Sequence, residues 1–313
     1  MVDNRQQWKA WLYLSPAIIL LLVFTVWPII NTLLMAFQNG YNANMAKIGV
    51  EFQFGIQNFI DVLKYDRFWK YLSNTMILCV ATVPLSTILA LLIAVALNSI
   101  KPLQKTLQTI YFLPYVTNSI AIGMVFAAMF NIIGNPSSGM VDSWGIVNNV
   151  VQWFGGEPIN WINAGSNYWA NITVMVVYIV WNALPFKILI LLGGLQSVNR
   201  QYYDAAKVDG TPRWRVLTKI TVPLLSPMIA YVVITGFIGG FKEYSSIVGI
   251  FDKDMGPGND EAFKTLNTMV GFIYDSLESR AHGLASAAAL ILFGIILVVT
   301  MINLQVSKKR VHF

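Results

Sequence analysis

Residues 71–100 read YLSNTMILCVATVPLSTILALLIAVALNSI, and no charged side chain interrupts the chain between Lys70 and Lys101. A helix rises about 1.5 Å per residue, and about 20 mainly apolar residues cross the roughly 30 Å hydrocarbon core of a bilayer. This stretch is long and apolar enough to do so. It therefore predicts a membrane-spanning helix.

Five more charge-free stretches of similar length occur in the chain, which is 56% hydrophobic and 12% charged with a mean hydropathy of +0.59. Soluble domains carry about twice that share of charge. Because lipid offers no partner for backbone polar groups, such stretches should be helical. We therefore expect an all-α polytopic membrane protein, forming a single transmembrane domain over residues 1–313. The expected spans lie near 11–37, 72–97, 109–133, 169–195, 224–250 and 282–305.

The composition excludes several other classes of protein. Cys79 is the single cysteine, and His282 and His312 are far apart, so neither a disulfide nor a metal site is expected. Phosphate-loop and nucleophile-elbow motifs are absent. We expect no cofactor, no catalytic residue and no nucleic-acid partner. The first stretch has no A-x-A cleavage site and is too long for a signal peptide, which favours a retained span.

The distribution of basic residues predicts the orientation. An even number of spans places both termini on one side, and the segments on that side hold 12 Lys or Arg in 57 positions, against 7 in 100 on the other. Basic residues concentrate in cytoplasmic loops. Both termini are therefore predicted to be cytoplasmic, in a multi-pass protein of the cell membrane. The cytoplasmic segments would be 1–10, 98–108, 196–223 and 306–313.

Four tryptophans gather in or beside the outer segment between spans three and four: Trp144, Trp153, Trp161 and Trp169. An aromatic belt at the membrane interface is one interpretation. The other is a lip that receives a partner protein or a sugar.

The cytoplasmic segment 199–223 predicts a stiff helical hairpin. Asn199 can cap a short helix that runs through Val208, and Gly210 can end it in the left-handed conformation. Thr211 is then expected to cap a second helix, with Pro212 at its first position.

Within this hairpin, DAAKVDG at 204–210 followed by ITVPLL at 220–225 resembles the EAA motif of the membrane subunits of ABC importers. That family usually has E-A-A-x-x-D-G-A and then I-x-L-P-L. Asp204 stands for the usual Glu and Thr211 for the usual Ala. Both departures keep charge or size.

The resemblance implies a coupling helix that docks in a cleft of a separate ATPase subunit. The residues that it assigns to this contact are Asp204, Ala205, Ala206, Asp209 and Gly210. It also implies the usual partners: a second homologous permease, two copies of the ATPase, an extracellular or periplasmic sugar-binding protein and the surrounding lipid. ATP hydrolysis is then the task of another chain.

Further short motifs are similar to the carbohydrate branch, the maltose-type permeases, in its compact six-span form. They are Leu14-Ser15-Pro16, Asn74-Thr75, Leu113-Pro114, Leu195-Gln196 and HGLASA at 282–287. They imply a sugar as cargo, with an oligosaccharide as the main expectation.

Polar groups inside the predicted spans give an independent indication. Lys187 lies about 13 Å from the cytoplasmic end of span four, where an ionisable side chain costs at least about 2.5–3.5 kcal/mol. We expect it to face a cavity, to extend to the interface or to pair with Glu243. The glycines 236, 239 and 240 could admit a ligand or a closely packed helix.

The resemblance, matched motif by motif, sets the sugar-facing positions on spans three to five. With Lys187 added, the predicted substrate pathway consists of Tyr115, Ser119, Ala183, Phe186, Lys187, Gly236, Gly239, Gly240 and Glu243. Tyr115 and Ser119 fit best, because they would lie on one helical face at i and i+4.

Other functions remain open at this stage. A cationic pocket with Lys187 and Lys242 would suit an anionic sugar derivative or a polyol phosphate. An ion-gradient-driven carrier would use Lys187 and Glu243 for coupling, but it leaves the EAA-like segment unexplained, and the two halves of the chain show no internal repeat. A scaffold protein would neither transport nor bind an ATPase.

Overall fold

The structure is a computed structural model. It describes residues 7–100, 106, 109–110, 113, 115–135, 140–257 and 264–310. Its contacts divide the chain into two compact units, one of Met1–Phe68 and Gly271–Gly294, the other of Trp69–Val270 and Ile295–Phe313.

The first unit begins with a long apolar helical segment and continues with short helices. Its elements are α1 (Gln7–Leu21), the π-helical turn η2 (Leu22–Val26), α2 (Trp27–Ala36), α3 (Ala43–Lys47) and α4 (Gln57–Lys64). The buried Asn58 fixes the turn after α2, because its amide nitrogen donates to the carbonyls of Ala36 at 3.0 Å and Gln38 at 2.7 Å. The first part of α16 (His282–Arg310) joins this unit through a hydrogen bond from Gly283 N to Tyr41 O.

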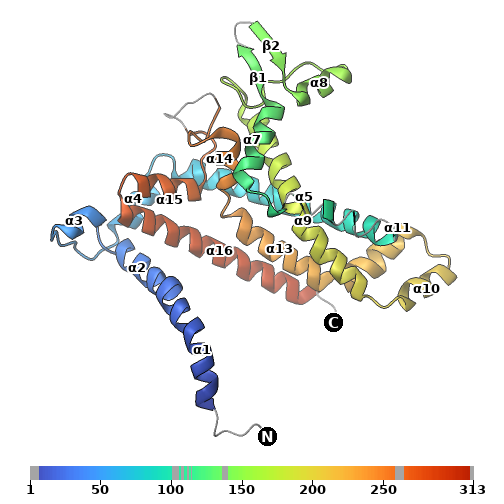
Figure 1. Cartoon of the computed structure of the whole chain (residues 1–313), viewed down its shortest axis with the longest axis horizontal. Coiled ribbons are helices and arrows are strands. Elements are labelled where there is room, and N and C mark those ends of the chain that lie inside the picture. The colour runs from blue at the N-terminus through green and yellow to red at the C-terminus, as the bar shows by residue number, and fades with distance from the viewer. Residues whose placement is uncertain are drawn as a thin grey trace. The chain divides into compact units, whose positions relative to one another are not determined.

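The second unit contains the helices on which the predicted site lies (Figure 1). Its elements are α5 (Phe68–Ser99), α7 (Ser119–Phe130), β1 (Ile132–Asn135), β2 (Met140–Trp144), α8 (Ile146–Trp153), α9 (Tyr168–Ser197), α10 (Gln201–Val208), α11 (Arg213–Val216), η4 (Leu217–Thr221), α12 (Val222–Leu224), α13 (Ser226–Gly240) and α14 (Ser245–Phe251). The helix α15 (Met269–Glu278) follows and continues into the first unit.

Four helices among the described residues are long and apolar enough to cross a membrane. They coincide with predicted spans one, two, four and six: Trp8–Ala36, Phe68–Ser99, Tyr168–Ser197 and His282–Lys308. A fifth candidate is the pair Arg213–Leu224 and Ser226–Gly240, whose axes meet at 72°. The chain is therefore a mostly helical, multi-pass membrane protein.

Two predicted spans are not continuous helices. The prediction for 224–250 is wrong between Phe241 and Tyr244, where α13 ends after the poor helix formers Gly239 and Gly240. The prediction for 109–133 is wrong at Asn118, which is extended and caps α7 through its side chain. Beyond α7 the chain is a strand, and part of this span, including Pro114, lies outside the described residues.

The described residues include one element that an all-α fold does not predict. Strands β1 and β2 pair antiparallel, with Ile132 opposite Trp144, and the register shifts between Ile133 and Gly134. Gly134 permits this irregularity because its φ is +115°. The two strands extend from the end of α7, with α8 beside them (Figure 1).

A buried lysine joins α5 and α9. Lys187 is 4% exposed, and its Nζ donates to Val83 O at 3.2 Å, Ser86 Oγ at 2.7 Å and Thr87 Oγ1 at 3.0 Å. An ammonium has three N–H donors, so each has an acceptor here. A buried charge is tolerated when its hydrogen bonds are satisfied in this way.

Helix α13 approaches the same face of α5 through two glycines. A Cβ on Gly236 would lie 3.1 Å from Val83 Cγ1 and 3.3 Å from Lys187 Nζ, and one on Gly240 would lie 2.8 Å from Cys79 Sγ. A Cβ on Gly239 would meet no atom within 4 Å. Gly236 and Gly240 thus allow close helix packing, as small residues do in membranes, whereas Gly239 borders open space. We call the cluster of Cys79, Val83, Lys187, Gly236 and Gly240 the three-helix junction.

This packing predicts opposite effects for neighbouring glycines. Gly240→Leu should push α13 away from Cys79 and destabilise the protein by about 1–3 kcal/mol, the usual cost of overpacking. Gly239→Leu should leave stability almost unchanged. Thermal unfolding of the detergent-solubilised protein measures both. Equal melting temperatures for the two variants would contradict the packing described here.

Candidate transport pathway and coupling helix

The break in predicted span five is held by polar groups from neighbouring segments. Glu243 lies in the non-helical residues between α13 and α14, and its Oε1 accepts a hydrogen bond from Ser246 N at 3.2 Å. The Glu243 carbonyl accepts from Thr268 Oγ1 at 2.9 Å. Non-helical backbone at membrane depth occurs where protein surrounds it or where it lines a cavity. The break is therefore a candidate for contact with a polar cargo.

Predicted span three is broken as well, and Tyr115 and Ser119 lie on opposite sides of that break. The expected shared helical face is wrong, because the extended Asn118 separates them and its Oδ1 accepts from Ile120 N at 2.8 Å. Ser119 O instead accepts a hydrogen bond from Tyr178 OH of α9.

The structure does bring Tyr115 to Phe186 of α9. Their rings stack with centroids 5.7 Å apart and planes at 17°. Tyr115 is 48% exposed and Phe186 is half-buried. A partly open aromatic stack offers an apolar platform with a hydroxyl at its edge. Ala183 lies on the same face of α9, one turn before Phe186 and Lys187.

The halves beyond the two breaks pack on each other. In α7, a Cβ on Gly123 would lie 2.7 Å from Gly249 Cα of α14, and one on Gly249 would lie 3.0 Å from Gly123 Cα. This glycine pair lets the backbones of the two helices touch. The half-helices α7 and α14 thus support each other next to α9, against which both pack.

The remaining predicted residues do not all face one space. The three-helix junction contains Lys187, Gly236 and Gly240. Among the described residues, no ion pair joins Lys187 to Glu243. Gly239 borders open space on α13.

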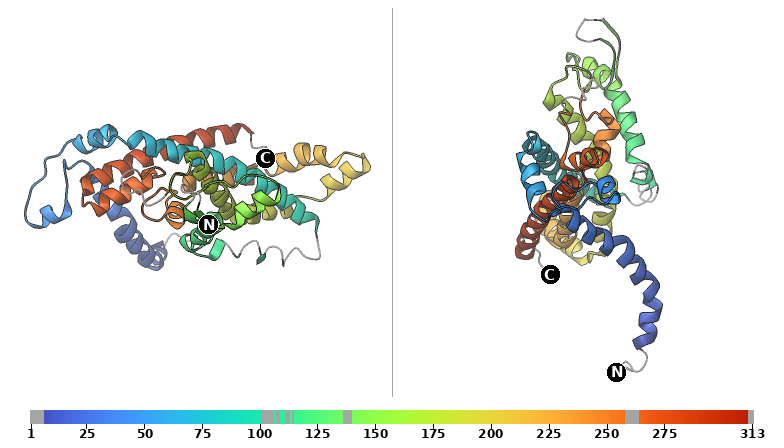
Figure 2. Two further views of the ribbon diagram at one scale, coloured as in Figure 1. Left: turned by 90° about the horizontal axis from the view of Figure 1, so that it is seen from above. Right: turned by 90° about the vertical axis from the view of Figure 1, so that its left-hand side faces the viewer.

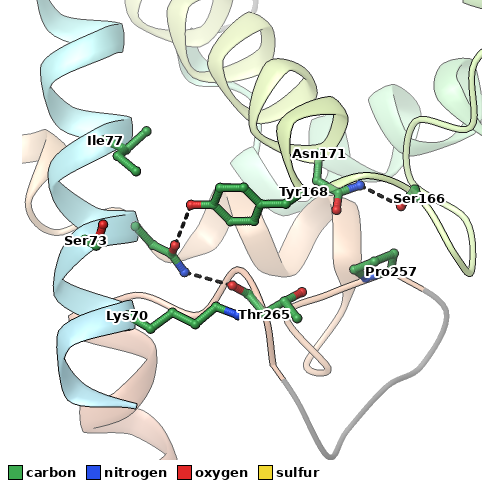
Figure 3. A pocket seen from close by; sticks show the side chains of 9 residues that line it. Lys70, Ser73, Ile77, Ser166, Tyr168, Asn171, Pro257 and Thr265 are labelled. Atoms are coloured by element: carbon green, nitrogen blue, oxygen red, sulfur yellow. Dashed lines mark hydrogen bonds between the residues drawn. The ribbon is translucent and has the colours of Figure 1, made fainter. Parts of the chain in front are cut away.

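Sequence reasoning missed a cleft of about 440 Å³ at the start of α9, whose lining includes several polar residues (Figure 3). Asn74 of α5 lies in its wall, where its Nδ2 donates to Thr265 O at 3.0 Å and its Oδ1 accepts from Tyr168 OH at 2.8 Å. Asn171 donates to Ser166 Oγ at 2.8 Å. The signal that could have found it is Asn74 itself, an amide within an otherwise apolar run. The lining residues are Lys70, Ser73, Asn74, Ile77, Ser166, Tyr168, Asn171, Pro257 and Thr265.

The segment 199–223 forms a helical hairpin that projects from the end of α9 (Figures 1 and 2). Helix α10 ends in a Schellman motif: Thr211 N bonds to Ala206 O at 2.9 Å and Gly210 N to Lys207 O at 3.2 Å. Gly210 has the left-handed φ of +66° that this motif requires. Asn199 Oδ1 accepts from Gln201 N at 3.0 Å at the start of the helix.

The second half of the hairpin differs by one residue from the prediction. Pro212 is the N-cap residue of α11, and Arg213 is the first residue of that helix. The Pro212 carbonyl accepts hydrogen bonds from Arg215 N and Val216 N. Thr211, which was predicted as this cap, instead donates its backbone N–H to Ala206 O at the end of α10.

Four of the five residues assigned to the ATPase contact are exposed, and one is not. Ala206 is 5% exposed and faces inward, where Tyr203 OH lies 3.4 Å from Thr221 Oγ1 and ties α10 to η4. The exposed four are Asp204, Ala205, Asp209 and Gly210. Beside them stand Tyr202 and Val208, 54% and 88% exposed. The outer side of α10 can therefore form an apolar contact.

Comparisons with known proteins agree with this architecture. The chain is 30% identical over 298 residues to the lactose transport system permease protein LacF of Rhizobium radiobacter, covering 94% of this chain and 91% of LacF. It is 28% identical over 299 residues to the arabinooligosaccharides transport system permease protein AraP of Bacillus subtilis (strain 168), covering 95% and 88%.

A solved structure shares the fold. It is the crystal structure of a bacterial ABC transporter involved in the import of the acidic polysaccharide alginate, with a TM-score of 0.76 and 22% identity over 98% of this chain and 97% of that chain. The resemblance expected from the EAA-like segment is thus confirmed at the level of the whole chain. The family described as "Binding-protein-dependent transport system inner membrane component" matches residues 84–312, and this protein belongs to that family.

Proposed function

We propose that this chain is one of two membrane-spanning subunits of an ABC importer that carries a sugar, most simply an oligosaccharide, into the cytoplasm by alternating access. The observation that carries the proposal is the exposed, Schellman-terminated helix α10 within a chain of this family. Hydrolysis of ATP belongs to a separate subunit of such importers. Relatives named for lactose and arabinooligosaccharides support a saccharide as cargo.

The proposed topology has six spans in a single transmembrane domain, with both termini in the cytoplasm. Spans three and five would each consist of two half-helices that meet at a break. The excess of basic residues in segments 1–10, 98–108, 196–223 and 306–313 supports this orientation. An external binding protein would deliver the sugar, and a second permease and two ATPase copies would complete the importer.

In this proposal the exposed side of α10 docks in the ATPase. Ala205 permits close approach, Tyr202 and Val208 supply apolar contact, and Asp204 and Asp209 add charge at the edge. Ala206 acts from the inner side by keeping α10 seated on the rest of the chain. A short stiff helix transmits a displacement without bending.

The sugar would pass between the breaks of spans three and five. The Tyr115–Phe186 stack provides the apolar surface that a sugar face requires, and the carboxylate of Glu243 at the break before α14 offers oxygen atoms to hydroxyl groups. Gly239, with open space beside it, and Ala183 leave room for the cargo. Ser119 positions the start of α7 through its bond to Tyr178.

The contacts of Lys187 do not support a role for it in binding an anionic cargo. All three donors of Lys187 already have acceptors on α5, so this cation has no N–H left for a phosphate or carboxylate. The same contacts weigh against a carrier mechanism that needs Lys187 to exchange partners with Glu243.

The coupling role predicts a specific loss in the Gly210→Asp variant. Asp tolerates the left-handed conformation better than most residues, so α10 should still end normally while a charged side chain obstructs the docked surface. Sugar uptake and co-purification of the ATPase should fall to background, with normal amounts of permease in the membrane. Gly49→Asp is the matched control, because Gly49 ends α3 by the same two hydrogen bonds at φ +86°. If Gly210→Asp transports like Gly49→Asp, the coupling role is refuted.

The pathway predicts that the Tyr115 ring matters more than its hydroxyl. An aromatic pair contributes about 0.5–1.5 kcal/mol beyond its buried area, so Tyr115→Ala should lower uptake roughly 2- to 10-fold. Tyr115→Phe keeps the stack on Phe186 and should retain most of the rate. Uptake of a labelled oligosaccharide series by the assembled importer measures both variants. An unchanged rate and substrate range in Tyr115→Ala would remove this residue from the pathway.

A further inference from the structure

Helix α8 turns one polar residue inward. The buried Asn148, 1% exposed, donates from Nδ2 to Ile159 O at 2.9 Å, and its Oδ1 accepts from Ile159 N at 3.0 Å and Trp161 Nε1 at 2.9 Å. These bonds fasten α8 to the chain that leads into α9. Trp161 is thereby a structural residue, packed edge-on against Phe130 of α7.

The outward side of α8 is mainly apolar, and Asn149, the polar residue beside it, donates from Nδ2 to Trp144 O at 3.3 Å. Ile146 is 60% exposed, Val150 46% and Trp153 83%, and Phe154 directly after the helix is 82% exposed. The rings of Trp153 and Phe154 lie 5.5 Å apart. Adjacent residues of a helix lie about 100° apart around the axis, so Ile146, Val150 and Trp153 form one stripe. We call these three residues and Phe154 the outer apolar face.

No charged residue occurs from 143 to 156. A surface with large exposed aromatic side chains and no charge is costly in water and marks an interaction site. A binding protein that comes and goes would leave this face wet for part of every transport cycle. Lipid, by contrast, is always present.

The outer apolar face also adjoins exposed apolar surface on a segment that is predicted to cross the membrane. Helix α8 packs on α7, whose Met124 and Val125 are 64% and 60% exposed. Trp169, in the first turn of α9, is 62% exposed. An exposed Trp at the end of a spanning helix is typical of the headgroup level. The indole of Trp153 suits the same level, because its ring is apolar and its N–H is a donor.

We infer that α8 is an interfacial helix, whose outer apolar face rests in the outer leaflet of the membrane at the headgroup boundary. It would anchor the hairpin of β1 and β2 and the start of α9 at a fixed depth. This inference rests on the proposed topology, which places α8 on the outer side, and not on the identity of the cargo or on the coupling helix.

Spin labels in the assembled importer, reconstituted in lipid nanodiscs, test it. The single native cysteine, Cys79, is replaced by Ala, and a label is attached to Trp153→Cys or, as matched control, to Gln152→Cys. Gln152 is exposed on the flank of the same helix. Collision rates with oxygen, which concentrates in lipid, and with a water-soluble nickel chelate report the surroundings of each label.

We expect the oxygen-to-nickel ratio at position 153 to be several-fold higher than at position 152. Equal ratios dominated by nickel would mean that the face is in water, and low collision rates with both reagents would mean that a protein partner covers it. Either result overturns the lipid contact. Sugar uptake by cells that express each cysteine variant serves as the check that the variant is folded.

Discussion

A backbone group that leaves a helix inside a membrane must find a partner within the protein. Both interrupted spans meet this constraint with side chains. Asn118 bonds to Ile120 N and Ala121 N where α7 begins, and Glu243 and Thr268 satisfy the break before α14. Because these interruptions need polar partners, they concentrate polarity in an otherwise apolar protein. The cargo site is proposed there for that reason.

The remaining packing depends on glycines at two places. The three-helix junction joins α5, α9 and α13 through Lys187, whose three donors all have acceptors, and through two glycines that leave no space for a side chain. The half-helices α7 and α14 meet backbone against backbone at Gly123 and Gly249, and large side chains of both helices, such as Phe126 and Ile250, pack in one apolar core. Both contacts therefore hold neighbouring helices close together.

The sequence was most informative where a single physical rule applies. Charge-free runs predicted four long helices because crossing lipid requires length and apolarity alone. Gly210 predicted the end of α10 because few residues adopt its φ. The breaks could not be predicted in this way, since the short polar stretches around them, 117–119 and 242–246, do not show by themselves whether a helix continues. Their effect depends on distant partners such as Thr268.

Residues with two possible roles were also undecidable from sequence. The sequence places Lys187 within span four but does not show whether its side chain faces sugar, Glu243 or hydroxyl groups. Only the position of Ser86 and Thr87 on α5 distinguishes these cases. The roles of the outer tryptophans likewise depend on contacts that the sequence does not show. Trp161 donates a hydrogen bond to Asn148, whereas Trp153 is exposed.

The geometry of the hairpin explains how one helix can act on several spans. Val198 to Arg200 alone separate α9 from α10, and the helical segment Arg213–Leu224 meets α13 at 72°. A push on α10 therefore reaches α9 directly and α13 through a bend. Since the three-helix junction joins α9 and α13 to α5, we expect these three helices to move together. The relative motion would then fall at the breaks, between α13 and α14 and before α7, where the cargo is proposed to pass.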